Sequence, residues 1–236
     1  MPEIIFTPAN KSVLDRFPAP QPASEFLPQW YKNQSARTSE SMTVGDNGIT
    51  NSTIKKCMPI LDDMTAGYII CLSSDILVSL EQDGNPRVDW SVTNCPNFIS
   101  THSPQQVSCV PIPDEYCPLP LKFQNFYRIT TPPGYSCLFR HPTWIDPAAP
   151  FLCFSGIVDT DAHPIPVEFP FLVKKGFTGV LEAGTPIMQV IPFKRQNWTS
   201  RVEGEDNEAG ALEFDKTTVK WVNRYKNNFR SVKSWK

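Results

Sequence analysis

The sequence has 236 residues, with 22 basic and 24 acidic side chains and a net charge of −2. This nearly balanced charge gives no electrostatic basis for binding nucleic acid, and no apolar run approaches the roughly 20 residues that a membrane-spanning helix needs. The 24 prolines argue against a helical bundle, because proline interrupts helices. The seven cysteines include no C-x-x-C pair, so we expect reduced, mostly buried thiols in a cytosolic protein rather than a zinc ribbon or a redox site.

Residues 1–50 are predicted to form an N-terminal arm that is rich in proline and aromatic residues. The segment IIFTPA is a strand candidate, whereas FPAPQPASEFLPQWYKNQ is too apolar for a linker and too often interrupted by proline for a long helix. The side chains that we expect to dock on the chain's own core are Phe17, Phe26, Leu27, Trp30 and Tyr31. In the alternative interpretation the arm reaches a neighbouring subunit, and Trp30 and Tyr31 are interface residues.

Residues 51–199 carry the pattern of an antiparallel β domain. Residues 66–92 are the clearest hairpin, because AGYIICLSSDILVSLEQ is apolar and β-branched, DGNP is a turn and RVDWSV alternates as a strand does. Further strands are expected in FQNFYRIT, YSCLFRH, FLCFSGIV, PVEFPFLV, GFTGVL and IMQVIPF. Short strands with turn signals about every 8–12 residues predict an all-β fold such as a sandwich, a jelly roll or a partly closed barrel.

Residues 200–236 differ from the β domain in composition. The first part, 200–211, is acidic and contains glycine, which predicts an exposed loop. Over residues 216–233 the apolar side chains fall on one helical face, so we expect a C-terminal α-helix there. From Lys216 onward the tail has seven basic residues and no acidic one.

The predicted C-terminal helix is amphipathic, with Trp221, Tyr225 and Phe229 on its apolar face. We favour packing of this aromatic stripe on the β domain, with the basic side chains in solvent. The alternative is a helix that binds a partner or a polyanion. In both cases these three residues are interface candidates, and we expect them to be buried on the same subunit or on a neighbouring one.

Two segments in the second half of the chain resemble the dUTPase and dCTP deaminase superfamily. GIVDTDAHPIPVEF is similar to the stretch in which an aspartate follows a short strand, and GVLEAGTPIMQVI is similar to the strand region that follows it. TPPGYSCLFRHP resembles the preceding turn and the strand that carries an arginine, and TAGYIICLSSD resembles an early segment. The positions that match the two main motifs are Gly156, Ile157, Val158, Asp159, Asp161, Gly184, Ile187, Gln189 and Val190.

The resemblance implies a β-clip fold of antiparallel strands, assembled as a homo-oligomer that is usually a trimer, with sites between subunits. Arg140, Asp161 and Gln189 lie in the matched segments and are candidate ligand-binding residues, together with His163 from the adjacent D-x-D-x-H pattern. Under an enzymatic alternative, the resemblance makes Asp159 the catalytic residue that orients a water for hydrolysis of a nucleotide, with Mg²⁺ neutralising the phosphates.

Departures from the superfamily pattern favour a role without catalysis. Ala162 stands where an aromatic residue stacks on the deoxyribose, and Pro164 stands where a glycine is usual. The glycine-rich phosphate-binding motif of dUTPases is replaced by the basic tail. Glu168 lies one residue out of register with the deaminase glutamate, and a shift of one residue turns a strand side chain to the opposite face. A nucleotide hydrolase or deaminase is therefore our alternative interpretation and not the first.

The whole chain also resembles uncharacterised proteins of T4-like marine and cyanobacterial phages, on the segments KKCMPILDDMTAGYI, TPPGYSCLF and SGIVDTD. This resemblance implies a viral protein in the virion or in the host cytoplasm, with other viral proteins as partners. We therefore expect a β-rich, homo-oligomeric phage protein that acts by binding or assembly, which includes a structural role in the virion. This role requires no cofactor.

A metal site and a cysteine nucleophile are weaker alternatives. Asp159, Asp161 and His163 would share one face if they lay on a strand, and with His141 they could hold a divalent cation. Turn capping by the two aspartates explains the same residues, and we predict no metal site because so short a match is weak evidence. Cys137 and His141 could in principle form a nucleophile and its base, but no orienting residue accompanies them.

Overall fold

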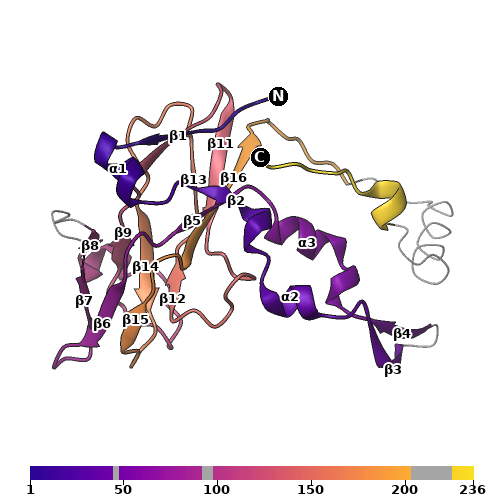
Figure 1. Ribbon diagram of the computed structural model, residues 1–236, viewed down its shortest axis with the longest axis horizontal. Helices are drawn as coiled ribbons and strands as arrows, with labels where there is room; N and C mark the ends of the chain where they lie inside the picture. Colours follow the sequence, from indigo (N-terminus) through magenta and orange to yellow (C-terminus); the bar gives the residue numbers. More distant parts are fainter. Residues whose placement is uncertain (45–47, 92–97, 203–224) are drawn as a thin grey trace.

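The computed structural model describes residues 1–44, 48–91, 98–202 and 225–236 (Figure 1). Strands dominate these residues, and the strand pairs are antiparallel. The prediction of an antiparallel all-β fold is therefore confirmed. Among the described strands, the sheets remain open and none closes into a barrel.

The described elements are short strands with a few helical turns between them. The strands are β1 (Ile5–Pro8), β2 (Gln21–Pro22), β3 (Arg37–Val44), β4 (Gly48–Ser52), β5 (Tyr68–Cys71), β6 (Ile76–Leu80), β7 (Pro86–Trp90), β8 (Ile99–Thr101), β9 (Leu121–Phe123), β10 (Tyr127–Thr130), β11 (Tyr135–Arg140), β12 (Phe151–Cys153), β13 (Gly156–Val158), β14 (Phe169–Val173), β15 (Gly179–Leu181) and β16 (Pro186–Lys194). The α-helices are α1 (Lys11–Arg16), α2 (Gln29–Asn33) and α3 (Met58–Met64).

Two larger sheets form the body of the molecule. One has the strand order β13-β11-β16-β5-β2 and the other the order β12-β14-β9-β8. Apolar side chains from both sheets belong to one buried cluster, and Phe139 on β11 lies against Phe169 on β14 with ring centroids 5.8 Å apart. Phe123 and Phe171 stack at 3.7 Å within the four-stranded sheet. Burial of these rings supplies much of the apolar area that stabilises the fold.

Three segments that were expected as single strands each contribute to two sheets. The segment AGYIICLSSDILVSLEQ divides into β5 and β6, FQNFYRIT into β9 and β10, and FLCFSGIV into β12 and β13. The break between β9 and β10 is at Asn125, whose Oδ1 accepts a hydrogen bond from the backbone N–H of Tyr127 (3.0 Å). Such a side-chain bond turns the backbone out of one sheet and into the next. The predicted β6–β7 hairpin is confirmed, with Ile76 opposite Trp90.

The N-terminal residues join the body of the molecule. β1 pairs with β10 and β2 pairs with β5. Phe17 and Tyr31 are buried, as the docking on the chain's own core predicts, and the Phe17 ring stacks on Phe126 at 4.1 Å. Trp30 is 37% exposed, and its Nε1 donates to the carbonyl oxygen of Trp144 (3.2 Å). Of the two predicted interface residues in this segment, Tyr31 therefore lies inside its own chain.

The C-terminal residues differ from the predicted helix. Most of the range 216–233, including Trp221, falls outside the described residues. Tyr225–Phe229 form a single π-helical turn, and residues 230–236 have no helical structure. Tyr225 and Phe229 are 44% and 57% exposed, so the expected burial on the same subunit is not found for these two residues.

Candidate functional site

Arg140 and Gln189 come together on the five-stranded sheet, where they hold the end of α3. They face each other across β11 and β16, and Arg140 donates to Gln189 Oε1 from Nε (3.1 Å) and Nη2 (2.9 Å). Gln189 Nε2 donates to the carbonyl oxygens of Asp63 (2.9 Å) and Ala66 (2.8 Å). Arg140 Nη1 also pairs with the Asp63 carboxylate (2.6 Å).

We call this cluster the α3 clamp. Hydrogen bonds within the protein occupy the polar atoms that would otherwise be available to a ligand. Gln189 is only 3% exposed, and both of its amide atoms are bonded within the protein. The C-terminal carbonyls of a helix lack partners within the helix, so an amide and a guanidinium that reach them fix its position. The geometry therefore gives Arg140 and Gln189 a positioning role, and their predicted role as ligand-binding residues gains no support from it.

Asp159 and Asp161 lie beside an arginine that the sequence patterns did not single out. Arg195, directly after β16, donates to both carboxylate oxygens of Asp161 and lies 3.1 Å from Asp159 Oδ1. The backbone N–H of Gly134 also donates to Asp161 Oδ2 (2.8 Å), and Ser136 donates to Asp159 Oδ1 (2.6 Å). Through these bonds the two aspartates connect the segment after β13 with the turn before β11 and with the residue that follows β16.

The two carboxylates differ in accessibility. The side chain of Asp161 is 10% exposed, whereas that of Asp159 is 63% exposed. The hydrogen bonds from Arg195, together with the one from Gly134, lower the pKa of Asp161 to about 2. Asp161 is therefore ionised throughout the neutral range and acts as an anchor for Arg195, while Asp159 presents the more accessible carboxylate.

The D-x-D-x-H pattern does not lie on a strand. β13 ends at Val158, and the backbone N–H groups of Ala162 and His163 both donate to the carbonyl oxygen of Asp159 (3.0 Å each), which makes the segment a turn. Alternate residues of a turn do not share one face, so the strand argument for a metal site fails. His163 Nδ1 lies 2.7 Å from the carbonyl oxygen of Ile165. In the described parts of the chain, no three His, Cys, Asp or Glu side chains are grouped as metal ligands.

Cys137 and His141 are not arranged as a nucleophile and its base. Cys137 is fully buried, and burial raises the pKa of its thiol to about 11. His141 has its pKa lowered by burial, and its Nδ1 accepts a hydrogen bond from the backbone N–H of Cys153 (3.3 Å). A buried thiol with a raised pKa is a poor nucleophile, because the thiolate is the reactive form.

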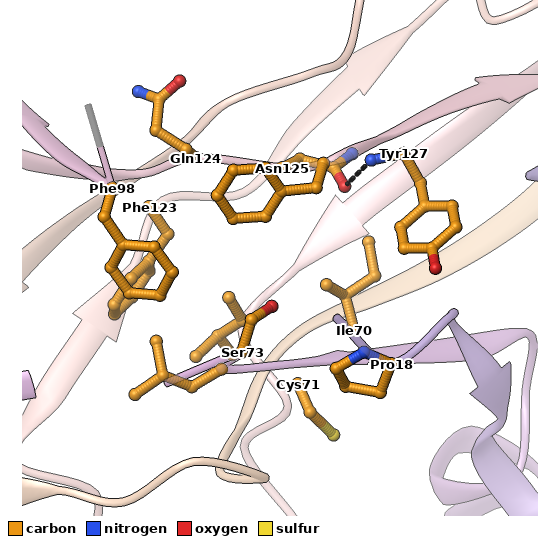
Figure 2. Close-up of a pocket in the computed structure, with 12 residues that line it drawn as sticks. Pro18, Ile70, Cys71, Ser73, Phe98, Phe123, Gln124, Asn125 and Tyr127 are labelled. Carbon is orange, nitrogen blue, oxygen red and sulfur yellow. Dashed lines mark hydrogen bonds between the residues drawn. The ribbon is translucent and has the colours of Figure 1, made fainter. Parts of the chain in front are cut away.

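Figure 2 shows a small cavity between aromatic and aliphatic side chains, away from the predicted site residues. Its volume of about 10 Å³ has room for one water molecule. Asn125 on its wall is 7% exposed, and its Nδ2 has no hydrogen-bond partner among the described residues. Pockets for small organic ligands are much larger, at about 300–1,000 Å³. None of Arg140, Asp159, Asp161, His163 and Gln189 lines this cavity.

Asp62 forms a further charged cluster that the sequence did not identify. Its carboxylate accepts from Arg230 Nη2 (2.6 Å) and from Lys233 Nζ (3.0 Å), and its side chain is 12% exposed. The hydrogen bond from Arg230 lowers the pKa of Asp62, with a smaller contribution from Lys233. The sequence offered only an indirect signal, namely a basic tail at one end of the chain and the adjacent acidic residues Asp62 and Asp63.

No protein-family model matches the chain, and no curated protein sequence matches it. The resemblances drawn from the motifs therefore stay predictions. The helices in the described ranges include none that is long and apolar enough to cross a membrane.

Because Asp161 is paired with Arg195, we expect the stability of the fold to depend on pH in the acidic range. Because the folded-state pKa of about 2 lies below the ordinary value of 3.8, this carboxylate stabilises the fold above about pH 4 and loses that contribution as the pH falls toward 2. Urea unfolding at several pH values should therefore show a steeper loss of stability for the wild type than for Asp161→Asn. Equal slopes for the two proteins would contradict the prediction.

Proposed function

We propose that the chain is a non-enzymatic β-rich protein that acts by binding and self-assembly as a homo-oligomer. The observation that carries the proposal is the position of its exposed apolar side chains. Of the described large apolar residues, those more than 80% exposed are Met1, Trp198, Val202 and Val232. Three of these four lie in residues 195–202 and 225–236, and Figure 1 shows the first range leading away from β16 and the second ending beside the body of the molecule. Apolar surface of this kind marks interaction sites.

The hairpin β3–β4 supports the same proposal. Figure 1 shows it projecting from the body near α2, on the side toward which the C-terminal region also extends. Among the strands that the structure describes, its two strands pair only with each other. An isolated two-stranded hairpin is marginally stable in water, so contact with another subunit would stabilise it.

The proposal extends to the viral context that the motif resemblance implies. A protein of this kind would act in the virion or in the host cytoplasm, and other viral proteins would be its further partners. A trimer is the assembly that the resemblance favours.

The nucleotide-enzyme alternative is supported only by the accessible carboxylate of Asp159. Against it, Asp159 Oδ1 already accepts from Ser136 and pairs with Arg195. A general base must be free to accept a proton from the attacking water. The other residues that the resemblance offered for ligand binding are bonded internally, Arg140 and Gln189 in the α3 clamp and Asp161 with Arg195.

Two measurements on one sample of the full chain test this function. Sedimentation analysis should give a mass that is a multiple of the 26.6 kDa chain mass, and dUTP or dCTP with Mg²⁺ should not be turned over. A monomer at all accessible concentrations would contradict the assembly role. Turnover that disappears in Asp159→Asn, with Asp161→Asn as the comparison for folding effects, would favour the enzyme instead.

A further inference from the structure

The C-terminal arm, defined as residues 225–236, contacts the body at two places. Arg230 and Lys233 bind the Asp62 carboxylate on α3. Trp235 lies edge-on against the Tyr68 ring, with centroids 6.4 Å apart, and the Tyr68 hydroxyl donates to the carbonyl oxygen of Lys236 (3.1 Å). We call Asp62 and Tyr68 the arm seat.

Charge makes this contact specific. The arm has four basic residues and no acidic one, and Arg230 binds Asp62 through both Nε and Nη2. The two side chains are 21% and 12% exposed. A guanidinium and a carboxylate in this geometry form one of the stronger polar contacts in proteins, and its orientation is defined.

The arm nevertheless leaves apolar side chains in solvent when it is seated on its own chain. Val232 is 88% exposed, and Tyr225 and Phe229 are 44% and 57% exposed. The segment that leads away from β16 adds Trp198 at 85% and Val202 at 99%. The arm seat thus holds the polar and indole groups of the arm, while Val232 stays almost fully exposed and Tyr225 and Phe229 stay partly exposed.

We propose that the C-terminal arm occupies the arm seat of a second copy of this chain, and that this exchange is the contact by which copies associate. The inference rests on the proposed assembly function and names its partner and site. Exchange keeps each contact of the arm seat, because both copies supply the same residues. It also brings a second body against the exposed apolar side chains of the arm and of the segment after β16.

The second copy is preferred over an unrelated partner because of complementarity. The arm seat already matches this arm in charge, through Asp62 with Arg230 and Lys233, and in shape, through Tyr68 with Trp235. An unrelated partner would have to displace these contacts before it could use the arm seat. A second copy must also displace the arm, but its own arm restores the same contacts, so exchange replaces each contact that it breaks.

Two variants with reversed charges, one in the arm and one in the arm seat, distinguish an arm that binds its own chain from an arm that binds another chain. Asp62→Arg and Arg230→Asp each place like charges in the arm seat, so each variant alone should run at 26.6 kDa in light scattering after gel filtration. When the two are unfolded together and refolded as a mixture, Arg230 of one chain can bind Asp62 of the other, and the converse pair also forms. The mixture should therefore run above 26.6 kDa, because each mixed pair of chains can exchange arms.

Lys226→Asp is the matched control, because it changes the charge of the arm equally and Lys226 is exposed. It should assemble as the wild type does. Circular dichroism of each variant checks that the β fold is retained. The double variant Asp62→Arg/Arg230→Asp should assemble by itself.

The remaining outcomes overturn the inference in distinguishable ways. Assembly of both single variants at the wild-type mass would place the interface elsewhere and leave the assembly function standing. Single variants that stay monomeric after mixing would show that the arm binds only its own chain. A monomeric wild type would contradict the assembly function itself.

Discussion

Replacing Gly67 by alanine should destabilise the protein by more than any substitution at its exposed turns. Gly67 lies between α3 and β5 with φ of +69°, a conformation that costs other residues about 1–2 kcal/mol. A Cβ atom at this position would also lie 2.0 Å from the carbonyl oxygen of Val190. Backbone atoms cannot move aside as a flexible side chain can, so β5 and β16 would have to separate.

Gly84→Ala is the matched control for this prediction. Gly84 has φ of +81°, but a Cβ there would meet nothing within 4 Å. The control therefore measures the cost of the left-handed backbone alone, and the difference between the two variants measures the close approach of the strands. Urea unfolding followed by circular dichroism gives both values. Equal destabilisation in the two variants would show that the strands do not approach so closely.

Replacing Gln189 by leucine should also lower the free energy of unfolding substantially. The change removes the donor to the Ala66 carbonyl and the acceptor of two Arg140 hydrogen bonds in a position that is 3% exposed. Each buried polar group left without a partner costs about 1–3 kcal/mol. We expect the loss to appear as faster hydrogen exchange of the α3 amides as well as a lower urea midpoint.

Gln106→Leu is the control for the loss of a glutamine, because Gln106 is exposed in the turn Pro104–Val107. Surface substitutions of this kind usually change stability by no more than about 0.5 kcal/mol. If Gln189→Leu were equally tolerated, the α3 clamp would not determine the position of α3.

The strands of this fold were largely predictable from the sequence, but their arrangement was not. Alternation of apolar and polar residues is a local signal, and it located the β6–β7 hairpin and the strands β11, β14 and β16. The same alternation continues through the corners where the chain passes between sheets. At Asn125 a single amide marks the change of sheet, and so small a signal cannot be separated from an ordinary polar residue within a strand.

The carboxylates of the candidate site were predictable, whereas their partners were not. Asp159 and Asp161 stood out by their motif, but the arginine that binds them lies 34 residues beyond Asp161 in the sequence. Its position depends on the pairing of β11 with β16, which sets Tyr135 opposite Lys194. The register between strands that are distant in the sequence is set when the sheet forms. It cannot be read from the local patterns of a single sequence.

Contact between the arm and the arm seat also has a consequence for the order of folding. Asp62 and Arg230 are 168 residues apart in the sequence, as are Tyr68 and Lys236. Closing so long a loop costs more conformational entropy than closing a short one, so contacts of this kind form slowly. During synthesis, α3 and β5 leave the ribosome long before the residues that seat on them. For that interval the Asp62 carboxylate and the Tyr68 ring are open, and an arm that already belongs to a completed neighbouring chain can reach them first.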